Sequence, residues 1–139
     1  MRASFPMLAL TSATLLAVGC TTYRDELVRV QNAYDANEHE TALALERAIE
    51  PNAALLTTAE RTRYYYLRGM TDFRIGYRGE ARHFLSISKA METQNPGALP
   101  TDWKNRLEET LSALNTEVYS NGISALSAHE AEAKKAKKK

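Results

Sequence analysis

The residues of this chain that could carry out chemistry are few and scattered. Its histidines are His39, His83 and His129, and its one cysteine is Cys20. The histidines lack the spacing of a zinc-protease helix, Cys20 has no partner for a metal or disulfide pair, and no glycine-rich phosphate loop occurs. No grouping of serine, histidine and aspartate predicts a nucleophilic triad either. We therefore expect no enzyme activity, no cofactor and no metal site.

Cys20 follows a segment that is typical of exported proteins. Arg2 gives a positive start, and residues 7–18 form an apolar stretch of twelve residues, too short to span a bilayer as a helix. The run Ala17-Val18-Gly19-Cys20 resembles a bacterial lipobox, although Ala17 stands where a leucine is usual. This resemblance implies cleavage before Cys20 and attachment of a diacylglycerol to its thiol.

Lipidation would anchor the protein without a transmembrane helix. One acyl chain anchors only marginally, at about 0.8 kcal/mol for each buried CH₂, whereas a lipoprotein of this type carries two or three chains. Thr21 stands where an aspartate tends to retain a lipoprotein in the inner membrane. We expect residues 1–19 to be a signal peptide and 20–22 the lipidated N-terminus, on the outer membrane of a bacterial cell envelope and facing the periplasm. The alternative is that Cys20 is a small buried residue near a cleavage site.

The composition is that of one soluble globular domain, with 44% hydrophobic and 25% charged residues. Residues 20–128 carry twelve basic and fifteen acidic side chains, whereas residues 129–139 carry five lysines and two glutamates. A mildly acidic body with a basic end is not the charge pattern of a nucleic-acid-binding protein. We expect no nucleic-acid partner.

The chain is organised around residues 64–90, which predict two helices and a tight turn. Small residues stand at Gly69, Gly76 and Ala81, at spacings of seven and five. This pattern resembles the tetratricopeptide repeat. The resemblance implies that Gly69 lets the partner helix approach, that Gly76 takes a positive φ in the turn, and that Ala81 lies where the helices cross.

Three residues depart from that repeat pattern. Arg68 replaces a usual leucine, Asp72 stands where an aromatic residue is expected and Phe73 follows it, and Ser88 replaces a usual alanine.

A second, weaker copy of the same pattern precedes it. Asn37 and Ala42 lie 39 residues before Gly76 and Ala81, so the turn and the crossing alanine recur. The helices that we expect span residues 23–36, 41–49, 59–75 and 79–93, with a linker at 51–58 and a break at 94–97. A fifth helix follows, and its apolar stripe is Trp103, Leu107, Leu111, Leu114 and Val118. The sequence thus predicts an all-α helix-hairpin repeat of about two helix pairs plus a C-terminal capping helix, over residues 23–120.

The end of the chain, residues 121–139, has no large apolar residue after Leu126. Its residues have high helix propensity, but it offers little apolar surface that could pack against the rest of the protein. We therefore expect a frayed helix or a flexible tail. Its lysines suit solubilisation, or attraction to lipid head groups, lipopolysaccharide or a cell-wall polymer. A further alternative is a covalent link from Lys139 to peptidoglycan.

The repeat resemblance also implies a binding groove. In that family the first helix of each pair lines a groove for extended peptides, and the matching residues here are Leu27, Gln31, Tyr34, Arg63, Tyr66, Met70 and Phe73. The apolar members suit an ordinary core almost equally well. The function that we expect is a membrane-anchored protein-protein interaction or assembly module of the envelope. The alternative is a small structural lipoprotein that contacts the cell wall or an anionic surface through its basic end.

Overall fold

Every regular element in the described part of the chain is a helix. The computed structural model describes residues 22–138. The elements are α1 (Tyr23–Asp35), α2 (His39–Ile49), the short 3₁₀ helix η1 (Glu50–Leu55), α3 (Thr58–Ile75), α4 (Arg78–Gln94), α5 (Thr101–Asn121) and α6 (Ser124–Ala136). The predicted all-α fold built from helical hairpins is confirmed.

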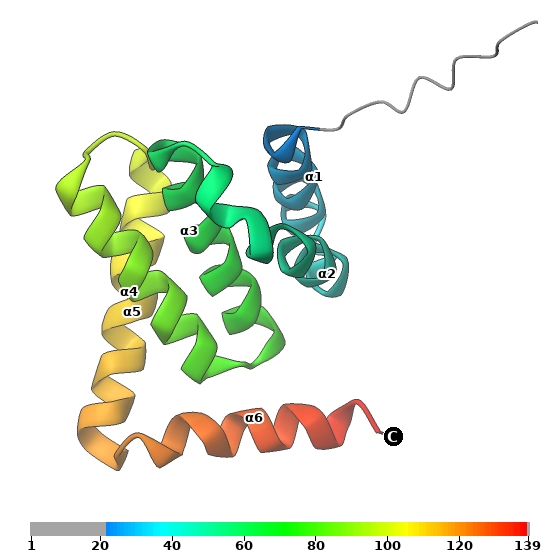
Figure 1. The fold of residues 1–139 in the computed structure, drawn as a ribbon. Helices are drawn as coiled ribbons and strands as arrows, with labels where there is room; N and C mark the ends of the chain where they lie inside the picture. The colour runs from blue at the N-terminus through cyan, green and yellow to red at the C-terminus, as the bar shows by residue number, and fades with distance from the viewer. Residues whose placement is uncertain (1–21, 139) are drawn as a thin grey trace, which may run out of the picture.

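The helices pack in the order in which they occur. α1 and α2 form one hairpin, α3 and α4 form a second with the largest helix–helix interface, and α2 also packs on α3. α5 lies against α4 and touches α3, at the opposite side of the central hairpin from α1 and α2 (Figure 1). The predicted capping helix is therefore present.

The turns of the two hairpins have the same conformation at the predicted positions. Asn37 has φ 61° and Gly76 has φ 100°, and both lie two residues before the next helix begins. Positive φ suits glycine, and asparagine is among the residues that tolerate it best. Ala42 and Ala81, five residues later, are both completely buried. The 39-residue repeat is thus a structural repeat.

The crossing of α3 and α4 depends on a glycine. A Cβ atom placed on Gly69 would lie 2.6 Å from Cγ of Leu85, much closer than carbon atoms normally approach. The absence of a side chain at Gly69 therefore lets α4 pack directly on the α3 backbone. Leu85 and Ala81 are themselves fully buried on the α4 side.

Two local devices fix where α3 and α5 begin. Thr57 and Glu60 form a capping box, in which Glu60 N–H donates to Thr57 Oγ1 at 3.2 Å and Thr57 N–H donates to Glu60 Oε2 at 3.0 Å. The loop before α5 is held by Glu92, whose carboxylate accepts the backbone N–H groups of Gly97, Ala98 and Leu99 at 2.8–3.0 Å.

The end of the chain, for which we expected a frayed helix or a flexible tail, is helical over residues 124–136. Residues 124–136 form α6, which packs on α5 and α4 and runs along the lower edge of the molecule in Figure 1. Leu126 is 3% exposed and belongs to the core. The one large apolar side chain of the segment is thus enough to dock the start of the helix. Just beyond α6, Lys137 pairs with Glu40 in the first turn of α2.

Candidate functional site

Three of the predicted partner-binding residues share one groove. Leu27 and Gln31 lie on α1, Arg63 lies on α3, and all three line a groove between these helices. Gln31 and Arg63 are exposed, whereas Leu27 is mostly buried. The prediction that they lie on one surface agrees with the structure.

The complete lining combines an apolar floor with charged edges. The α1–α3 groove consists of Arg24, Leu27, Val28, Gln31, Glu60, Arg63 and Leu67. Leu27, Val28 and Leu67 provide the apolar surface, and Val28 is 53% exposed. The groove encloses about 130 Å³, well below the roughly 300–1,000 Å³ of a small-molecule pocket. It is large enough for one apolar side chain.

The charged edges of the groove are held in place by the surrounding structure. Arg24 Nε lies 3.8 Å from Glu60 Oε1, so this ion pair bridges α1 and α3. Hydrogen bonds from the Thr57 side chain and backbone lower the pKa of Glu60, so its carboxylate is ionised. Arg63 Nε donates to the Ala98 carbonyl at 2.8 Å, and Ala98 lies in the loop that Glu92 holds.

The remaining predicted groove residues lie elsewhere. Tyr34, Tyr66 and Met70 are 8%, 1% and 3% exposed and belong to the core. Tyr66 lies beneath α5, stacked on Trp103 with a centroid distance of 4.5 Å. Phe73 is half-buried, with the Arg78 guanidinium 5.4 Å above its ring. Of the two alternatives given by the sequence, a binding groove or an ordinary core, the structure shows the core for Tyr34, Tyr66 and Met70.

Four lining residues were not predicted, although the sequence contained a signal for them. Arg24 lies three residues before Leu27, and Val28 lies three residues before Gln31, so both continue the face of α1 that the predicted residues occupy. Glu60 and Leu67 extend the face of Arg63 in the same way. A search for residues at helical spacing around each predicted position would have found all four.

A second polar cluster is buried between the two hairpins. Arg68 donates through Nε to Asp72 Oδ2 at 3.0 Å and through an Nη atom to Glu50 at 3.0 Å. Glu46, on α2, accepts from the Thr71 hydroxyl at 2.9 Å. Arg68 thus joins α3 to the end of the first hairpin.

Burial shifts the pKa of two carboxyl groups in this cluster, Glu46 and Asp72. Desolvation raises the pKa of Glu46 to about 8, against the opposing effects of its Thr71 hydrogen bond and the Arg68 charge. Desolvation also raises the pKa of Asp72 to about 6, although Arg68 pairs with it. One oxygen of each carboxyl group, Glu46 Oε2 and Asp72 Oδ1, is buried without a hydrogen-bond partner.

The three histidines lie in three different helices. His39 lies in α2, His83 in α4 and His129 in α6. Burial and the nearby Arg74 lower the pKa of His39, whose ring lies 5.4 Å from that of Tyr34. His83 is exposed and its ring contacts Phe84.

The described residues, 22–138, contain neither a candidate metal-binding cluster nor a candidate membrane-spanning helix. Within that range no group of three or more histidine, cysteine, aspartate or glutamate residues is arranged to hold a metal ion. None of the helices described is long and apolar enough to cross a membrane. The predicted signal peptide and Cys20 lie outside the described residues, so the lipid anchor stays a prediction.

The chain was also compared with known proteins. Neither protein-family models, nor curated protein sequences, nor solved structures gave a match.

Proposed function

We propose that this chain is a lipid-anchored module of the bacterial cell envelope that binds a protein partner through the α1–α3 groove. The anchor is the expected lipid on Cys20, on the outer membrane and facing the periplasm. The observation that carries the binding proposal is the groove itself, in which an apolar floor lies between arginines on two neighbouring helices.

The chemistry of the groove favours one kind of partner segment. Its volume of about 130 Å³ accommodates a single side chain, and its exposed Val28 offers apolar surface beside it. Arg24, Arg63 and Glu60 leave a net positive edge, because two cations face one carboxylate. The best complement is a peptide or loop that presents an apolar side chain next to an acidic one.

The alternative function, contact with a wall polymer or anionic surface through the basic end, has less support. Lys134 pairs with Glu130 at 2.9 Å, and Lys137 pairs with Glu40. Two of the lysines on which that function depends are therefore already neutralised by the chain's own carboxylates.

Site-specific photo-crosslinking in cells tests the groove directly. A photoreactive residue replaces Val28, and the matched control replaces Ala48, an exposed residue of α2 outside the groove. We expect a discrete crosslinked product from position 28 and none from position 48. Adding Arg24→Glu, at a side chain that is 80% exposed, should remove that product without changing the melting temperature. Equal products from both positions, or none from position 28, would contradict the proposal.

A further inference from the structure

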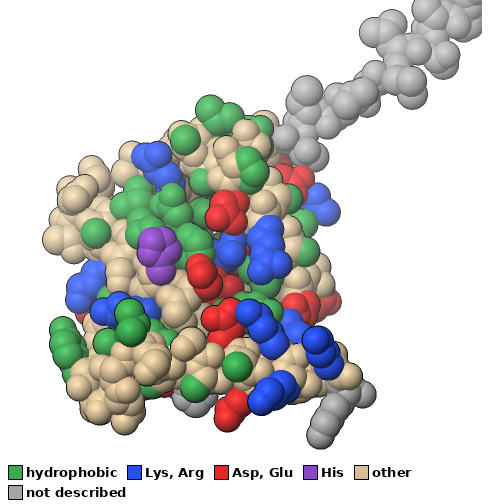
Figure 2. All heavy atoms as spheres, turned by 60° about the horizontal axis from the view of Figure 1, so that its bottom comes forward, with side chains coloured by type: hydrophobic (Ala, Val, Ile, Leu, Met, Phe, Trp, Pro, Cys, Tyr) green, Lys and Arg blue, Asp and Glu red, His purple; other side chains and the backbone are tan. Residues whose placement is uncertain are grey.

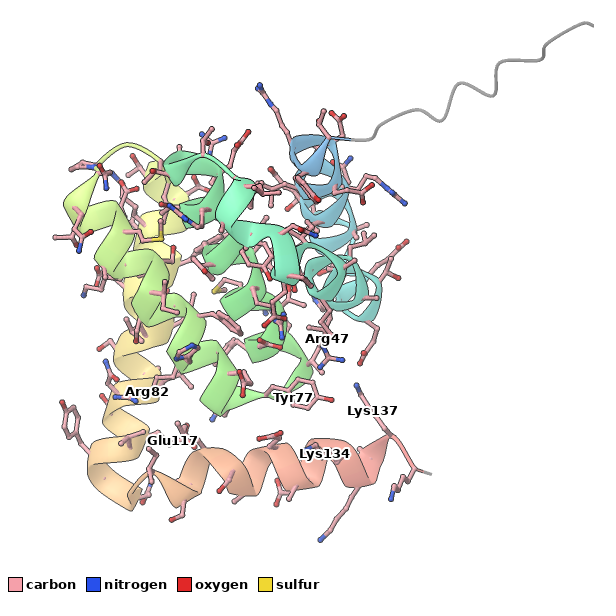
Figure 3. The ribbon with its side chains drawn as sticks, in the orientation of Figure 1. Arg47, Tyr77, Arg82, Glu117, Lys134 and Lys137 are labelled. Atoms are coloured by element: carbon pink, nitrogen blue, oxygen red, sulfur yellow. The ribbon has the colours of Figure 1, made fainter. Side chains whose placement is uncertain are left out.

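A second, polar cleft lies between α6 and the two hairpins. The α6 cleft is lined by Arg47, Arg68, Asp72, Tyr77, Glu80, Glu130 and Lys134, and its volume is about 320 Å³. Figure 3 shows Arg47 and Tyr77 pointing toward the side of the molecule where Lys134 of α6 and Lys137, just beyond α6, lie. In Figure 2, which brings α6 forward, basic and acidic side chains are interspersed on this face.

The charges of the cleft are balanced in sign. Its lining contains three cations and three carboxyl groups: Arg47, Arg68, Lys134, Asp72, Glu80 and Glu130. A ligand that is only an anion or only a cation would meet as many like charges as opposite ones. The lining therefore favours a ligand that carries both signs of charge.

Some of these charges are already paired, and others are available. Arg68 is held by Asp72 and Glu50, and Lys134 by Glu130. Arg47 and Glu80, both exposed, make no hydrogen bond or ion pair with any residue in the range 22–138. The cleft thus offers one cation from α2 and one carboxylate from α4 that have no hydrogen-bonded partner, although both charges influence the pKa of Asp72.

Asp72 supplies an independent indication of a ligand. Its side chain is completely buried and lines the cleft, and Oδ1 has no hydrogen-bond donor, although Oδ2 accepts from Arg68. An unsatisfied buried acceptor destabilises the folded protein, and more so when it is charged. Oδ1 is itself not solvent-accessible, so a ligand N–H group would donate to it only after the Asp72 side chain turned toward the cleft.

We propose that the α6 cleft binds a free α-amino acid as its zwitterion. The ammonium group lies toward Asp72 and Glu80, and the carboxylate lies toward Arg47. The volume of about 320 Å³ is at the small end of the roughly 300–1,000 Å³ of ligand pockets, which suits a molecule of this size. The site is separate from the α1–α3 groove and does not depend on it.

The position of α6 adds a consequence that can be measured. Glu130 and Lys134 form one wall of the cleft, and α6 is held at its start by Leu126 and beyond its end by the pairing of Lys137 with Glu40. Ligand bound between this wall and the hairpins should hold α6 in place. Hydrogen exchange in residues 124–136 should therefore become slower when the cleft is filled.

Titration of the full chain in mild detergent tests the proposal. The natural amino acids are added singly at millimolar concentration, and amide NMR shifts and hydrogen exchange are recorded. We expect at least one of them to shift the amides of Asp72, Tyr77 and Glu80 and to protect α6. Propionate and ethylamine carry one charge each, glucose carries none, and at the same concentration none of the three should have this effect.

Charge-removing variants complete the test. Arg47→Gln and Glu80→Gln change exposed side chains and should each weaken binding by about tenfold or more, as the loss of a charged hydrogen bond does. Arg106→Gln and Glu109→Gln, on the exposed side of α5, are the matched controls and should bind like wild type. The proposal is overturned if no amino acid binds, if a single-charge probe or glucose binds equally well, or if the cleft variants keep full affinity.

Discussion

The ring of Tyr66 stacks on the indole of Trp103, with centroids 4.5 Å apart and planes inclined by 16°. Tyr66 is 1% exposed on α3, and Trp103 lies in the first turn of α5. This contact attaches α5 to the central hairpin.

We expect the two rings to be energetically coupled. Tyr66→Leu and Trp103→Leu, singly and together, should give a coupling free energy of about 0.5–1.5 kcal/mol beyond the loss of buried area. Urea unfolding of the four proteins measures it. Strictly additive effects would mean that the stacking contributes nothing specific.

The close approach at Gly69 predicts opposite outcomes for two glycine substitutions. Gly69→Ala would place a methyl group 2.6 Å from Leu85 Cγ and should destabilise the fold by about 1–3 kcal/mol. Gly79→Ala meets no atom within 4 Å and should be stabilising by about 0.5–1 kcal/mol, because it removes a glycine from a helix. Thermal melting compares them, and equal melting temperatures would contradict the proposed crossing.

The buried Glu46 predicts a stability that falls as the pH rises. The folded state keeps the Glu46 proton up to a pKa of about 8, whereas the unfolded chain loses it near its ordinary value of 4.5. Between these values the folded state binds more protons, so the free energy of unfolding decreases with pH, by roughly 3–5 kcal/mol over the whole window. Asp72, with its pKa raised to about 6, acts in the same direction at the acidic end.

Glu46→Gln tests this linkage, because the amide keeps an acceptor for Thr71 and has no charge to bury. Urea unfolding between pH 5 and 8 should show a flatter pH dependence than wild type and a more stable variant at the alkaline end. Glu109→Gln, at an exposed position, should retain the wild-type slope. A wild-type stability that rises over this range would contradict the assignment.

The docking of α6 predicts that Leu126 contributes to stability. Leu126→Ala should destabilise the protein by about 2–5 kcal/mol, as other large-to-small core substitutions do. Ile123, which is 71% exposed, provides the control, and Ile123→Ala should change stability by less than about 0.5 kcal/mol. If Leu126→Ala were as mild as the control, the segment would be the flexible tail first expected from the sequence.

The predicted anchor has its own test. Cys20→Ser removes the thiol that would be acylated, so the variant should accumulate as an uncleaved precursor or a soluble form. Cell fractionation and the size of the product report this result. A variant of mature size that still sediments with membranes would disprove the lipoprotein prediction.

The repeat pattern predicted the hairpins because it rests on backbone requirements. Each requirement restricts the residue type, so it can be recognised in the sequence. A positive φ is found at Asn37 and Gly76, and a fully buried alanine at Ala42 and Ala81. The groove was only partly predictable, because helix periodicity does not reveal which neighbour covers a given face. Tyr66 has the spacing of a groove residue, yet α5 covers it.

The three departures from the repeat pattern have one explanation. Arg68 and Asp72, four residues apart on α3, form a buried ion pair, and Ser88 Oγ donates to the Thr62 carbonyl at 3.0 Å where the helices meet. Each polar replacement gains a partner that the usual apolar residue would not need. The spacing of Arg68 and Asp72 was a visible signal, but their burial and the role of Glu46 depend on the tertiary fold.

The opposite placement of α1 and α6 sets the reach of the molecule. Cys20 and Tyr23 are three residues apart, so a lipid on Cys20 would leave at most about 10 Å of extended chain before α1. α1 begins at one end of the molecule and α6 runs along the other (Figure 1). Because this linker is so short, α6 would lie at the end of the domain away from the bilayer that holds the lipid. The lysines of α6 would then lie on the side of the domain that is farther from the lipid anchor.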